Sequence, residues 1–324
     1  MAAARVRLIV DTDGGVDDLV ALWWLLGQAE VEVVAIVATW GNVDALGAAT
    51  NVARVLHAAG RSDITLALGA FEPSGPAPLE GVAAHVHGDD GLGGTGAAWP
   101  TGDVAPVRLP VAQLLSGLTG SEPGGLDLLT LGPLTTLAAA LAADPGLASR
   151  IGSLTVMGGA VRRGGNALPW GEANIAHDPV AAAAVVAAPW ARPPLLVGLD
   201  ATLAARLSGD DLDAADAGTT PAARMLASPL RAYAAFYAAT GLRPEGTFPC
   251  HDLLAAVAAL DPSVITESPV VPLAVDTGGS AAWGMTVADL RAAPQLKPTG
   301  FAPWRVALGA DESRLRAAFR SILT

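Results

Sequence analysis

The alternation of short apolar runs with helix-patterned segments is the feature of this chain that most restricts its fold. RLIV (residues 7–10) and the β-branched run VEVVAIVAT (31–39) predict two buried strands, and ITLAL (64–68) predicts a third. Segments with helical apolar spacing separate them, over 18–28 and 43–59. Strands that show no polar face are buried on both sides, which is typical of parallel sheets covered by helices.

The second half of the chain continues this alternation after an irregular, Gly- and Pro-rich segment over 71–110. Strands are predicted at 126–131, 153–159 and 194–200, and helices at 133–143 and 178–188. Asp178 and Pro179 provide the last of these helices with an N-cap and a first-turn proline. Near the C-terminus, VVPLAVDT and GMTVADL flank a GGSAAW turn and predict a hairpin.

The expected fold class is therefore α/β. We predict an open, mostly parallel, Rossmann-like central sheet with helices on both faces and a small C-terminal hairpin. We find no linker and no internal repeat in the sequence, so residues 1–324 are predicted to form a single domain.

The amino-acid composition restricts the partners that this protein can bind and the compartment that it fits. The formal net charge of −12 disfavours binding to nucleic-acid polymers, whose phosphates would be repelled. The single cysteine, Cys250, allows no internal disulfide and fits a reducing compartment. The longest apolar stretch, over 128–143, contains Gly132 and Pro133 and fits a strand, a turn and a helix better than a membrane span. With an N-terminus that does not resemble a signal peptide, these features predict a cytoplasmic protein.

The stretch VDTDGGVDD follows the first strand and packs four carboxylates into nine residues: Asp11, Asp13, Asp17 and Asp18. One acid suffices to cap the following helix, so capping leaves most of the cluster unexplained. A hard cation would neutralise it, and carboxylate oxygens suit Ca²⁺ or Mg²⁺. An EF-hand is excluded because its fifth and twelfth positions from Asp11 are Gly15 and Leu22.

Ligands of open parallel sheets bind beyond the carboxyl ends of the strands. The predicted strand ends here carry polar or flexible residues at 11–18, 39–42, 131–132, 158–159 and 200. A site is therefore expected at this edge of the sheet.

Two other interpretations of local motifs compete with a simple cation site. A strand followed by DTDGGV also fits aspartyl-nucleophile phosphatases of the haloacid-dehalogenase type, in which the first Asp is the nucleophile. Such enzymes also need a downstream basic residue, and the only lysine, Lys297, lies in no convincing context. GLGGTG (91–96) matches the dinucleotide fingerprint, but no strand precedes it and Pro100 follows, so it is predicted to be a loop.

Three further segments carry polar side chains without a decisive pattern. HDLLAA (251–256) opens a helix, in which Asp252 would complement the helix dipole and His251 would lie on the surface. GGNALPWGEAN (164–174) and HVHGDDGLGG (85–94) are polar loops, and loops are commonly polar.

Taken together and in order, these segments resemble the inosine–uridine-type nucleoside hydrolases. DTDGGVDD resembles that family's DxDPGxDD signature, and TWGNV, VHGDDGLGG and LGPLTTLAAAL resemble three of its later motifs. The run VMGG…GGN…GEANIAHDPVAA and the segment PCHDLLA match the remaining two. The resemblance extends from about Val6 to the end of the predicted hairpin.

The resemblance implies calcium-dependent hydrolysis of the N-glycosidic bond of ribonucleosides, in purine or pyrimidine salvage. Ca²⁺ would be held by the carboxylates of Asp13, Asp18 and Asp252 and by the backbone carbonyl of Leu131. Asp13 would also be the general base that activates a metal-bound water, and His251 would protonate or guide the leaving nucleobase. The ribose hydroxyls would be bound by Asp17, Asn42, Asn166, Glu172 and Asn174. His87 would line the base side, and Asp11 would order the acidic loop from behind.

Several departures from the family pattern concern pocket shape rather than the carboxylates. Gly14 stands where the family usually has Pro, and Ala173 and Trp283 replace an aromatic residue and an arginine of the family at positions where pocket shape or packing can change. Tyr233, Phe236 and Tyr237 are expected to face the core from a helix, whereas Phe248 and Trp170 are the aromatic candidates for the pocket. The nucleobase is left open, a homodimer or homotetramer is expected from the resemblance, and a nucleoside- or ribose-binding protein without turnover is the non-enzymatic alternative.

Overall fold

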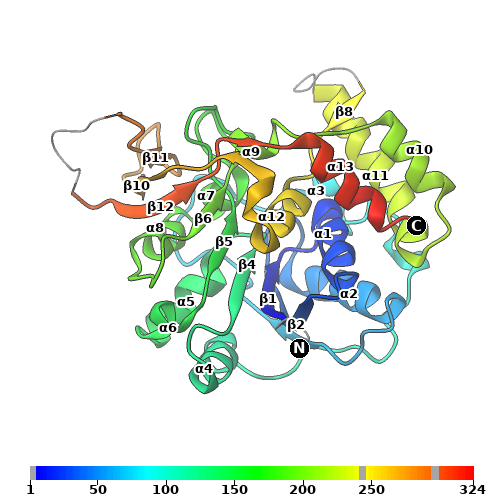
Figure 1. The fold of residues 1–324 in the computed structure, drawn as a ribbon, viewed down its shortest axis with the longest axis horizontal. Coiled ribbons are helices and arrows are strands. Elements are labelled where there is room, and N and C mark those ends of the chain that lie inside the picture. The colour runs from blue at the N-terminus through cyan, green and yellow to red at the C-terminus, as the bar shows by residue number, and fades with distance from the viewer. Residues whose placement is uncertain (1–4, 241–245, 293–298) are drawn as a thin grey trace.

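The structure, a computed structural model, describes residues 5–240, 246–292 and 299–324 (Figure 1). Residues 241–245, which the sequence predicts to be part of a short irregular segment over 241–250, and Lys297 lie outside these ranges. A nine-stranded sheet runs through the molecule in the order β11-β10-β12-β6-β5-β4-β1-β2-β3. Its strands are β1 (Val6–Thr12), β2 (Val31–Ala38), β3 (Thr65–Leu68), β4 (Asp127–Thr130), β5 (Leu154–Met157), β6 (Leu195–Val197), β10 (Val270–Val275), β11 (Thr286–Ala288) and β12 (Ala302–Val306).

The predicted mostly parallel sheet is confirmed. Every pairing from β3 across to β12 is parallel, and only β10 runs antiparallel to its two neighbours. The predicted hairpin forms from β10 and β11 but extends the main sheet through β12, a strand that the sequence pattern did not indicate. The strand predicted over 194–200 is shorter than expected, because α9 (Leu199–Thr202) begins directly after β6 and places Asp200 on a helix.

Helices cover both faces of the sheet, as predicted, and Figure 1 shows the two groups on opposite sides of it. One face carries α1 (Val16–Leu26), α2 (Ala45–Ala58), α11 (Pro221–Thr240), α12 (His251–Leu260) and α13 (Glu312–Ser321). The other carries α4 (Val111–Ser121), α5 (Thr135–Ala143), α6 (Leu147–Arg150), α7 (Ala173–His177) and α8 (Pro179–Ala187). Alternate residues of β1 supply the two cores: Leu8 and Val10 point to the first and Ile9 to the second.

Short elements complete the chain around these layers. They are α3 (Ala84–His87), α10 (Gly209–Ala217), two 3-10 turns (Gly96–Ala98 and Pro262–Val264), and the pairs β7 (Leu207–Ser208) with β8 (Thr247–Phe248) and β9 (Ile265–Glu267) with β13 (Gly309–Ala310). The predicted cap of α8 is confirmed, since the Asp178 carboxylate accepts the Ala181 N–H at 2.9 Å and Pro179 opens the helix.

The strand order positions a binding site between β1 and β4. From β1 the chain proceeds to β2 and β3 on one side, then returns and proceeds from β4 to β5 and β6 on the other. The connections after β1 and β4 therefore leave the sheet in opposite directions and open a crevice at the carboxyl ends of these two strands. Asp13 follows β1 and Leu131 follows β4, so both predicted site residues lie at this crevice.

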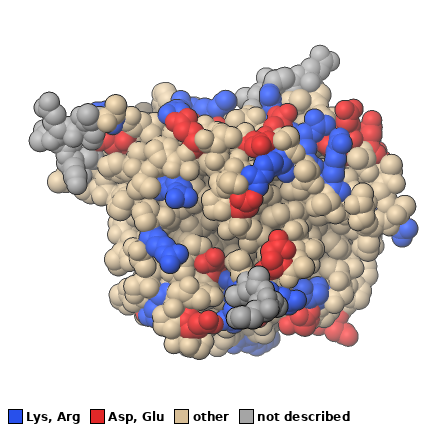
Figure 2. Space-filling view, in the orientation of Figure 1, with Lys and Arg blue, Asp and Glu red and all other residues tan. Residues whose placement is uncertain are grey.

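Within the described residues, no helix is long and apolar enough to cross a membrane. On the face shown in Figure 2, acidic and basic side chains are interspersed. Ion pairs between side chains that are not buried join Arg314 to Asp261 and Arg162 to Glu267.

The attachment of β12 to the helical layer can be tested at Trp304, which is completely buried and donates its indole N–H to the Val186 carbonyl of α8 at 3.0 Å. Trp304→Ala should lower the free energy of unfolding by about 3–5 kcal/mol, because it leaves a large cavity in the second core. Leu46→Ala, at a side chain that is 57% exposed, should change it by less than about 0.5 kcal/mol. Urea unfolding of both variants checks this, and equal effects would contradict the assigned packing.

Candidate active site

The acidic loop is ordered by backbone N–H groups at the start of α1. The helix begins at Val16, two residues before the predicted start, so Asp18 occupies its third position. The Asp18 carboxylate accepts the N–H of Gly15 at 3.0 Å and the hydroxyl of Thr12. Capping therefore accounts for Asp18, but it leaves the burial of the other three aspartates unexplained.

Asp13 is fixed by the neighbouring strand end. Asn42 follows β2, and it donates its backbone N–H to Asp13 Oδ2 at 2.9 Å and its side-chain Nδ2 to Asp13 Oδ1 at 2.8 Å. The same Nδ2 also lies 3.1 Å from Asp18 Oδ2. The amide of Asn42 thus bridges two carboxylates that would otherwise repel each other.

Three carboxylates meet at the crevice. Asp17, Asp18 and Asp252 are buried and each offers an oxygen within 4.8 Å of the others. Burial, followed by the charge of Asp18, raises the pKa of Asp17 to about 7. Burial and the charges of Asp17, Asp18 and Asp13 raise the pKa of Asp252 well above its usual range.

A cation fits this cluster. No Lys or Arg is among the described residues that line the cavity above it, so no side chain there offsets the negative charge. Asp11 Oδ1 is also buried and has no hydrogen-bond partner within the described chain. Asp11 therefore adds a further buried carboxylate that is close enough to Asp18 to feel its charge. All of these donors are oxygens, the ligand type that hard divalent cations prefer.

Hydrogen bonds from α7 reach the carboxyl ends of β4 and β5. Asn174 donates its Nδ2 to the Leu131 carbonyl at 2.6 Å and lies 3.2 Å from the Met157 carbonyl. Glu172 is the N-cap of α7 and accepts N–H groups from Asn174, Ile175 and Gly159. Burial raises the pKa of Glu172 even though these N–H groups favour its charged form.

A cavity of about 300 Å³ lies above this floor. It is lined by most of the residues that the sequence singled out: Asp17, Asn42, His87, Leu131, Asn166, Glu172, Asn174, His251 and Asp252. Asp11, Asp13 and Asp18 lie beneath its surface rather than on it. Asn166 is exposed at the rim, where its Oδ1 accepts the N–H of Ala173 at 3.0 Å.

His251 is buried, so the surface position that HDLLAA favours when read by itself is wrong. Its Nδ1 lies 2.7 Å from the Thr202 hydroxyl and its Nε2 lies 3.1 Å from the Tyr237 hydroxyl. Its backbone N–H donates to Asp17 Oδ2 at 3.1 Å. A ring held at both nitrogens keeps a fixed orientation toward the cavity.

His87 accepts a backbone hydrogen bond, because the N–H of Val16 points at its Nδ1 at 3.1 Å. Burial lowers the pKa of His87 to about 4, so the ring is neutral at physiological pH. The remaining ring nitrogen is then a donor, and the ring lies against Tyr233 with centroids 5.3 Å apart.

The aromatic predictions are confirmed only for part of α11. Tyr233 and Tyr237 are buried in the first core, as predicted, but together with Phe236 they also line the cavity. The pocket positions predicted for Phe248 and Trp170 are wrong. Phe248 is 1% exposed and packs in the first core, and Trp170 is 51% exposed and does not line the cavity. The reason is long-range: the pairing of β8 with β7 fixes Phe248 against Tyr233, and no local pattern encodes it.

The sequence analysis assigned no role to several residues in or beside the cavity. His177 stands directly before the Asp178–Pro179 helix start, and Met157 ends β5. Thr202 reaches His251 from α9, whose position depends on the truncation of β6. A count of histidines offers one clue, since four of the five in the chain line this cavity: His85, His87, His177 and His251.

The sequence model of the inosine–uridine preferring nucleoside hydrolases matches residues 8–317. The chain belongs to this family. It is 32% identical to a probable uridine nucleosidase of Arabidopsis thaliana, with 81% of this chain and 80% of the relative covered. It is 31% identical to an inosine–uridine preferring nucleoside hydrolase of Leishmania major, with 88% of each chain covered.

Solved structures of nucleoside hydrolases share the whole fold. A plant nucleoside hydrolase superposes with a TM-score of 0.89 at 30% identity, and it covers 98% of both chains. A purine-preferring ribonucleoside hydrolase from Gardnerella vaginalis gives a TM-score of 0.87 at 29% identity and the same coverage. The expected family and fold class are thereby confirmed for this nucleoside hydrolase.

The structure of this hydrolase shows where the departures from the family pattern lie and which backbone conformation one of them adopts. Gly14 has φ +71°, a value that proline cannot adopt, so the loop here needs glycine where the family usually has Pro. The Gly14 carbonyl accepts the Nδ2 of Asn51 at 2.9 Å, which ties the loop to α2. Trp283 lies outside the cavity lining, whereas Ala173 lies within it.

The loop conformation can be tested with Gly14→Ala. A Cβ at this position would lie 2.6 Å from the Ala48 Cα, so the variant should lose roughly 2–5 kcal/mol of folding free energy from strain and overpacking. Gly60→Ala is the matched control, because Gly60 has φ +67° but open space around it, and it should lose only about 1–2 kcal/mol. Equal losses in urea unfolding would show that the contact with α2 is unimportant.

Proposed function

We propose that this nucleoside hydrolase is calcium-dependent and cleaves the N-glycosidic bond of ribonucleosides, releasing ribose and a free nucleobase. The observation that carries the proposal is the buried carboxylate cluster at the floor of the cavity, between the carboxyl ends of β1 and β4. Family membership supports ribonucleoside hydrolysis, and the oxygen-only donor set supports a hard cation.

The residues proposed to hold calcium are Asp13, Asp18 and Asp252, with the backbone carbonyl of Leu131. Asp18 and Asp252 offer oxygens close together, and Asp17 lies in the same group. When bound, the ion supplies an anchor for sugar hydroxyls and lowers the pKa of water. Ca²⁺ tolerates the irregular spacing of oxygens that come from two helices and two strand ends better than Mg²⁺ does.

Asp13 is proposed as the general base that accepts a proton from the attacking water. Without an ion, burial and the nearby charge of Asp18 raise the pKa of Asp13, and a bound cation would oppose this rise. The two hydrogen bonds from Asn42 hold the carboxylate in one orientation. A carboxylate held in one orientation beside the bound water would meet the geometric requirement of general base catalysis.

The leaving nucleobase is proposed to depart on the side of His251. Cleavage of an N-ribosyl bond passes through an oxocarbenium-like sugar, and the departing base must gain a proton or a hydrogen bond. His251, whose ring is held by Thr202 and Tyr237, would serve as that donor by exchanging its contact with the Tyr237 hydroxyl for one with the base. Tyr233 and Phe236 offer apolar ring surface on the same side, and His87 lies against Tyr233.

The ribose is proposed to lie over the floor between β1 and α7. Its hydroxyls would be bound by Asp17, Asn42, Asn166, Glu172 and Asn174, all of which line the cavity. These side chains offer carboxylates and amides for neutral hydroxyls. No arginine or lysine among the described lining residues offers a contact for a phosphate, which supports free nucleosides over nucleotides.

The alternatives are less well supported. An aspartyl-nucleophile phosphatase is not favoured by the family match or by a cavity lining without Lys or Arg in the described chain. A binding protein without turnover would not need the proposed base, which is present.

Relatives are named for uridine, for inosine and uridine, and for purines, so we propose no single nucleobase. A homodimer or homotetramer and a cytoplasmic location are proposed from the resemblance and the single cysteine.

The role of Asp13 can be tested with Asp13→Asn, which keeps the size of the side chain. It should lower kcat for nucleoside cleavage by about 10²–10⁴-fold, as expected for loss of a general base, while far-UV circular dichroism stays unchanged. Asp89→Asn, at an exposed carboxylate in a neighbouring loop, should retain full activity. Full turnover by Asp13→Asn in an assay of free ribose would refute the assignment.

Calcium dependence can be tested by removal of the ion. Chelation should abolish turnover and lower Tm, and added Ca²⁺ should restore both, with about 2.7 kcal/mol of stabilisation at a hundredfold excess over Kd. Asp252→Asn should reduce this calcium-dependent rise in Tm, because one ligand loses its charge. An identical Tm with and without Ca²⁺ for the unmodified chain would contradict the proposed site.

A further inference from the structure

Asn51 is a completely buried polar residue of α2 to which the proposed chemistry gives no role. Its side-chain Nδ2 donates to the Gly14 carbonyl at 2.9 Å and to the Asp90 carbonyl at 2.8 Å. Gly14 belongs to the acidic loop, and Asp90 belongs to the loop that follows His87. One amide thus joins two segments of the cavity region that are far apart in the sequence.

The orientation of this amide is fixed by Arg54. That side chain donates its Nη1 to Asn51 Oδ1 at 2.8 Å and its Nε to the Trp99 carbonyl at 3.1 Å. A guanidinium can only donate hydrogen bonds, so the amide oxygen must face it. Both N–H groups of Asn51 are then directed at the two carbonyls, and an apolar side chain of the same size could not replace them.

The loop over 88–96, which includes the GLGGTG motif, is held together by its own hydrogen bonds. The Asp90 carboxylate accepts three backbone N–H groups at 2.8–2.9 Å, from Leu92, Gly94 and Gly96. The N–H of Gly93 donates to the His87 carbonyl at 2.8 Å. The N–H groups that a phosphate would need are therefore already bound, and the loop instead connects Asn51 with His87.

The acidic loop has little covalent restraint at Gly14. Glycine does not fix φ as the usual proline of the family does, so contacts from other segments must hold this position. The loop over 88–96 supplies one besides Asn51, because a Cβ on Gly91 would lie 2.7 Å from the Gly14 carbonyl oxygen. The two loops are therefore packed backbone against backbone.

His87 contacts the acidic loop at a second point, since its Nδ1 accepts the Val16 N–H. Gly14 and Val16 both lie between Asp13 and Asp18, two of the proposed calcium ligands. The segment that carries His87 thus contacts the chain that connects these ligands at both ends of its turn.

We propose that Asn51 is a positioning residue that locks the loop over 88–96 to the acidic loop, so that the calcium site and His87 become ordered together. This inference rests on the proposed function, which assigns calcium to the acidic loop and the nucleobase to the side of His87. Linkage makes the effect reciprocal. A loop held by Asn51 favours ion binding, and a bound ion favours the ordered position of His87.

The lock can be tested with Asn51→Leu, which keeps the approximate size of the side chain and removes both hydrogen bonds. The Kd for Ca²⁺, measured by calorimetry, should rise by about threefold to tenfold, as expected when part of the energy of two hydrogen bonds is lost. In hydrogen–deuterium exchange, Ca²⁺ should protect residues 88–96 of the unmodified protein, and this protection should fall in Asn51→Leu. An unchanged Kd or an unchanged protection would overturn the inference.

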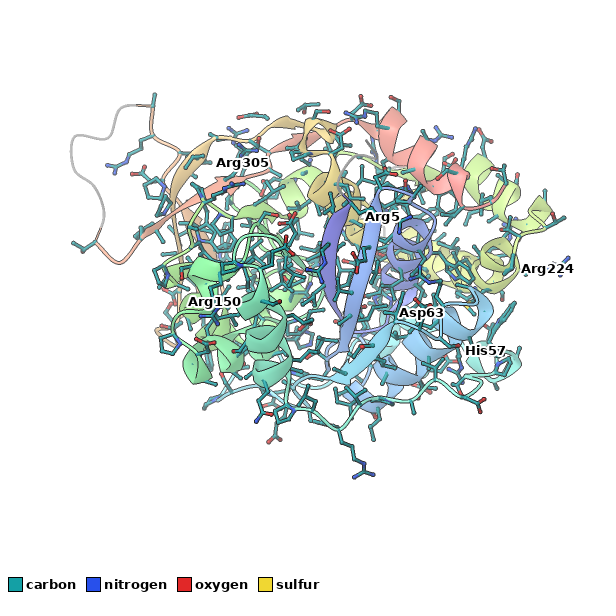
Figure 3. The ribbon with its side chains drawn as sticks, turned by 60° about the horizontal axis from the view of Figure 1, so that its bottom comes forward. Arg5, His57, Asp63, Arg150, Arg224 and Arg305 are labelled. Atoms are coloured by element: carbon teal, nitrogen blue, oxygen red, sulfur yellow. The ribbon has the colours of Figure 1, made fainter. Side chains whose placement is uncertain are left out.

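His57→Leu is the matched control for a leucine on α2. His57 is exposed near the end of this helix and lies at the periphery of the molecule in Figure 3. This variant should keep both the Kd for Ca²⁺ and the protection of residues 88–96. The same rise in Kd in both leucine variants would show that the effect is not specific to Asn51.

Two glycine variants decide the question if Asn51→Leu does not fold. Gly91→Ala places a methyl group 2.7 Å from the Gly14 carbonyl oxygen and 2.7 Å from Asn51 Nδ2, which forces the two loops apart. Gly94→Ala carries similar backbone strain, with φ +82° against +72°, but no atom of the described chain beyond its sequence neighbours lies within 4 Å of that Cβ. Gly91→Ala should raise the Kd for Ca²⁺ by about threefold or more relative to Gly94→Ala. Equal Kd values would refute the lock.

Failure of the proposed function gives a different result. If the unmodified protein binds no Ca²⁺, the calcium proposal fails, and hydrogen–deuterium exchange without the ion decides the inference. Faster exchange over both 11–18 and 88–96 in Asn51→Leu, but not in His57→Leu, would support the lock. Faster exchange confined to α2, or no change, would rule it out.

Discussion

Electrostatic repulsion among buried aspartates is the constraint on which the rest of this site depends. Asp11, Asp13, Asp17 and Asp18 are each no more than 3% exposed, and Asp252 joins them from α12. Burial favours protonation of such groups, and proximity favours it further. The protein offsets part of this cost with backbone N–H groups at the start of α1 and with the amide of Asn42. The remainder is consistent with a site built for a cation.

The topology explains why these groups can meet. β1 and β4 are adjacent in the sheet but are separated by more than a hundred residues, and the chain leaves their carboxyl ends in opposite directions. The space between them is therefore not filled by a crossover connection. Asn42 reaches it from β2, and Asn174 reaches the Leu131 carbonyl from α7. Packing of the two apolar cores on either face of the sheet holds these strand ends in register.

The cavity walls are less regular than its floor, and this difference determined which predictions succeeded. The floor follows strand ends, so Asp13, Asn42 and Leu131 could be placed from the strand pattern and the family motifs. The wall on the base side comes from α11, whose Tyr233 and Tyr237 serve the core and the cavity at once. Helical periodicity distinguishes a buried face from an exposed one, but it does not distinguish core from cavity.

The sequence by itself determined the alternation of the strands β1 to β6 with helices, the clustering of acids after β1 and the family, because these depend on local patterns. Only the tertiary structure decided that Phe248 is core and Trp170 is exposed, and that His251 is buried between Thr202 and Tyr237. It also placed His177 on the cavity wall, with an Nδ1 that has no hydrogen-bond partner in the described part of the chain. These outcomes depend on contacts between residues far apart in the chain, which set the direction of each side chain and which no local pattern records.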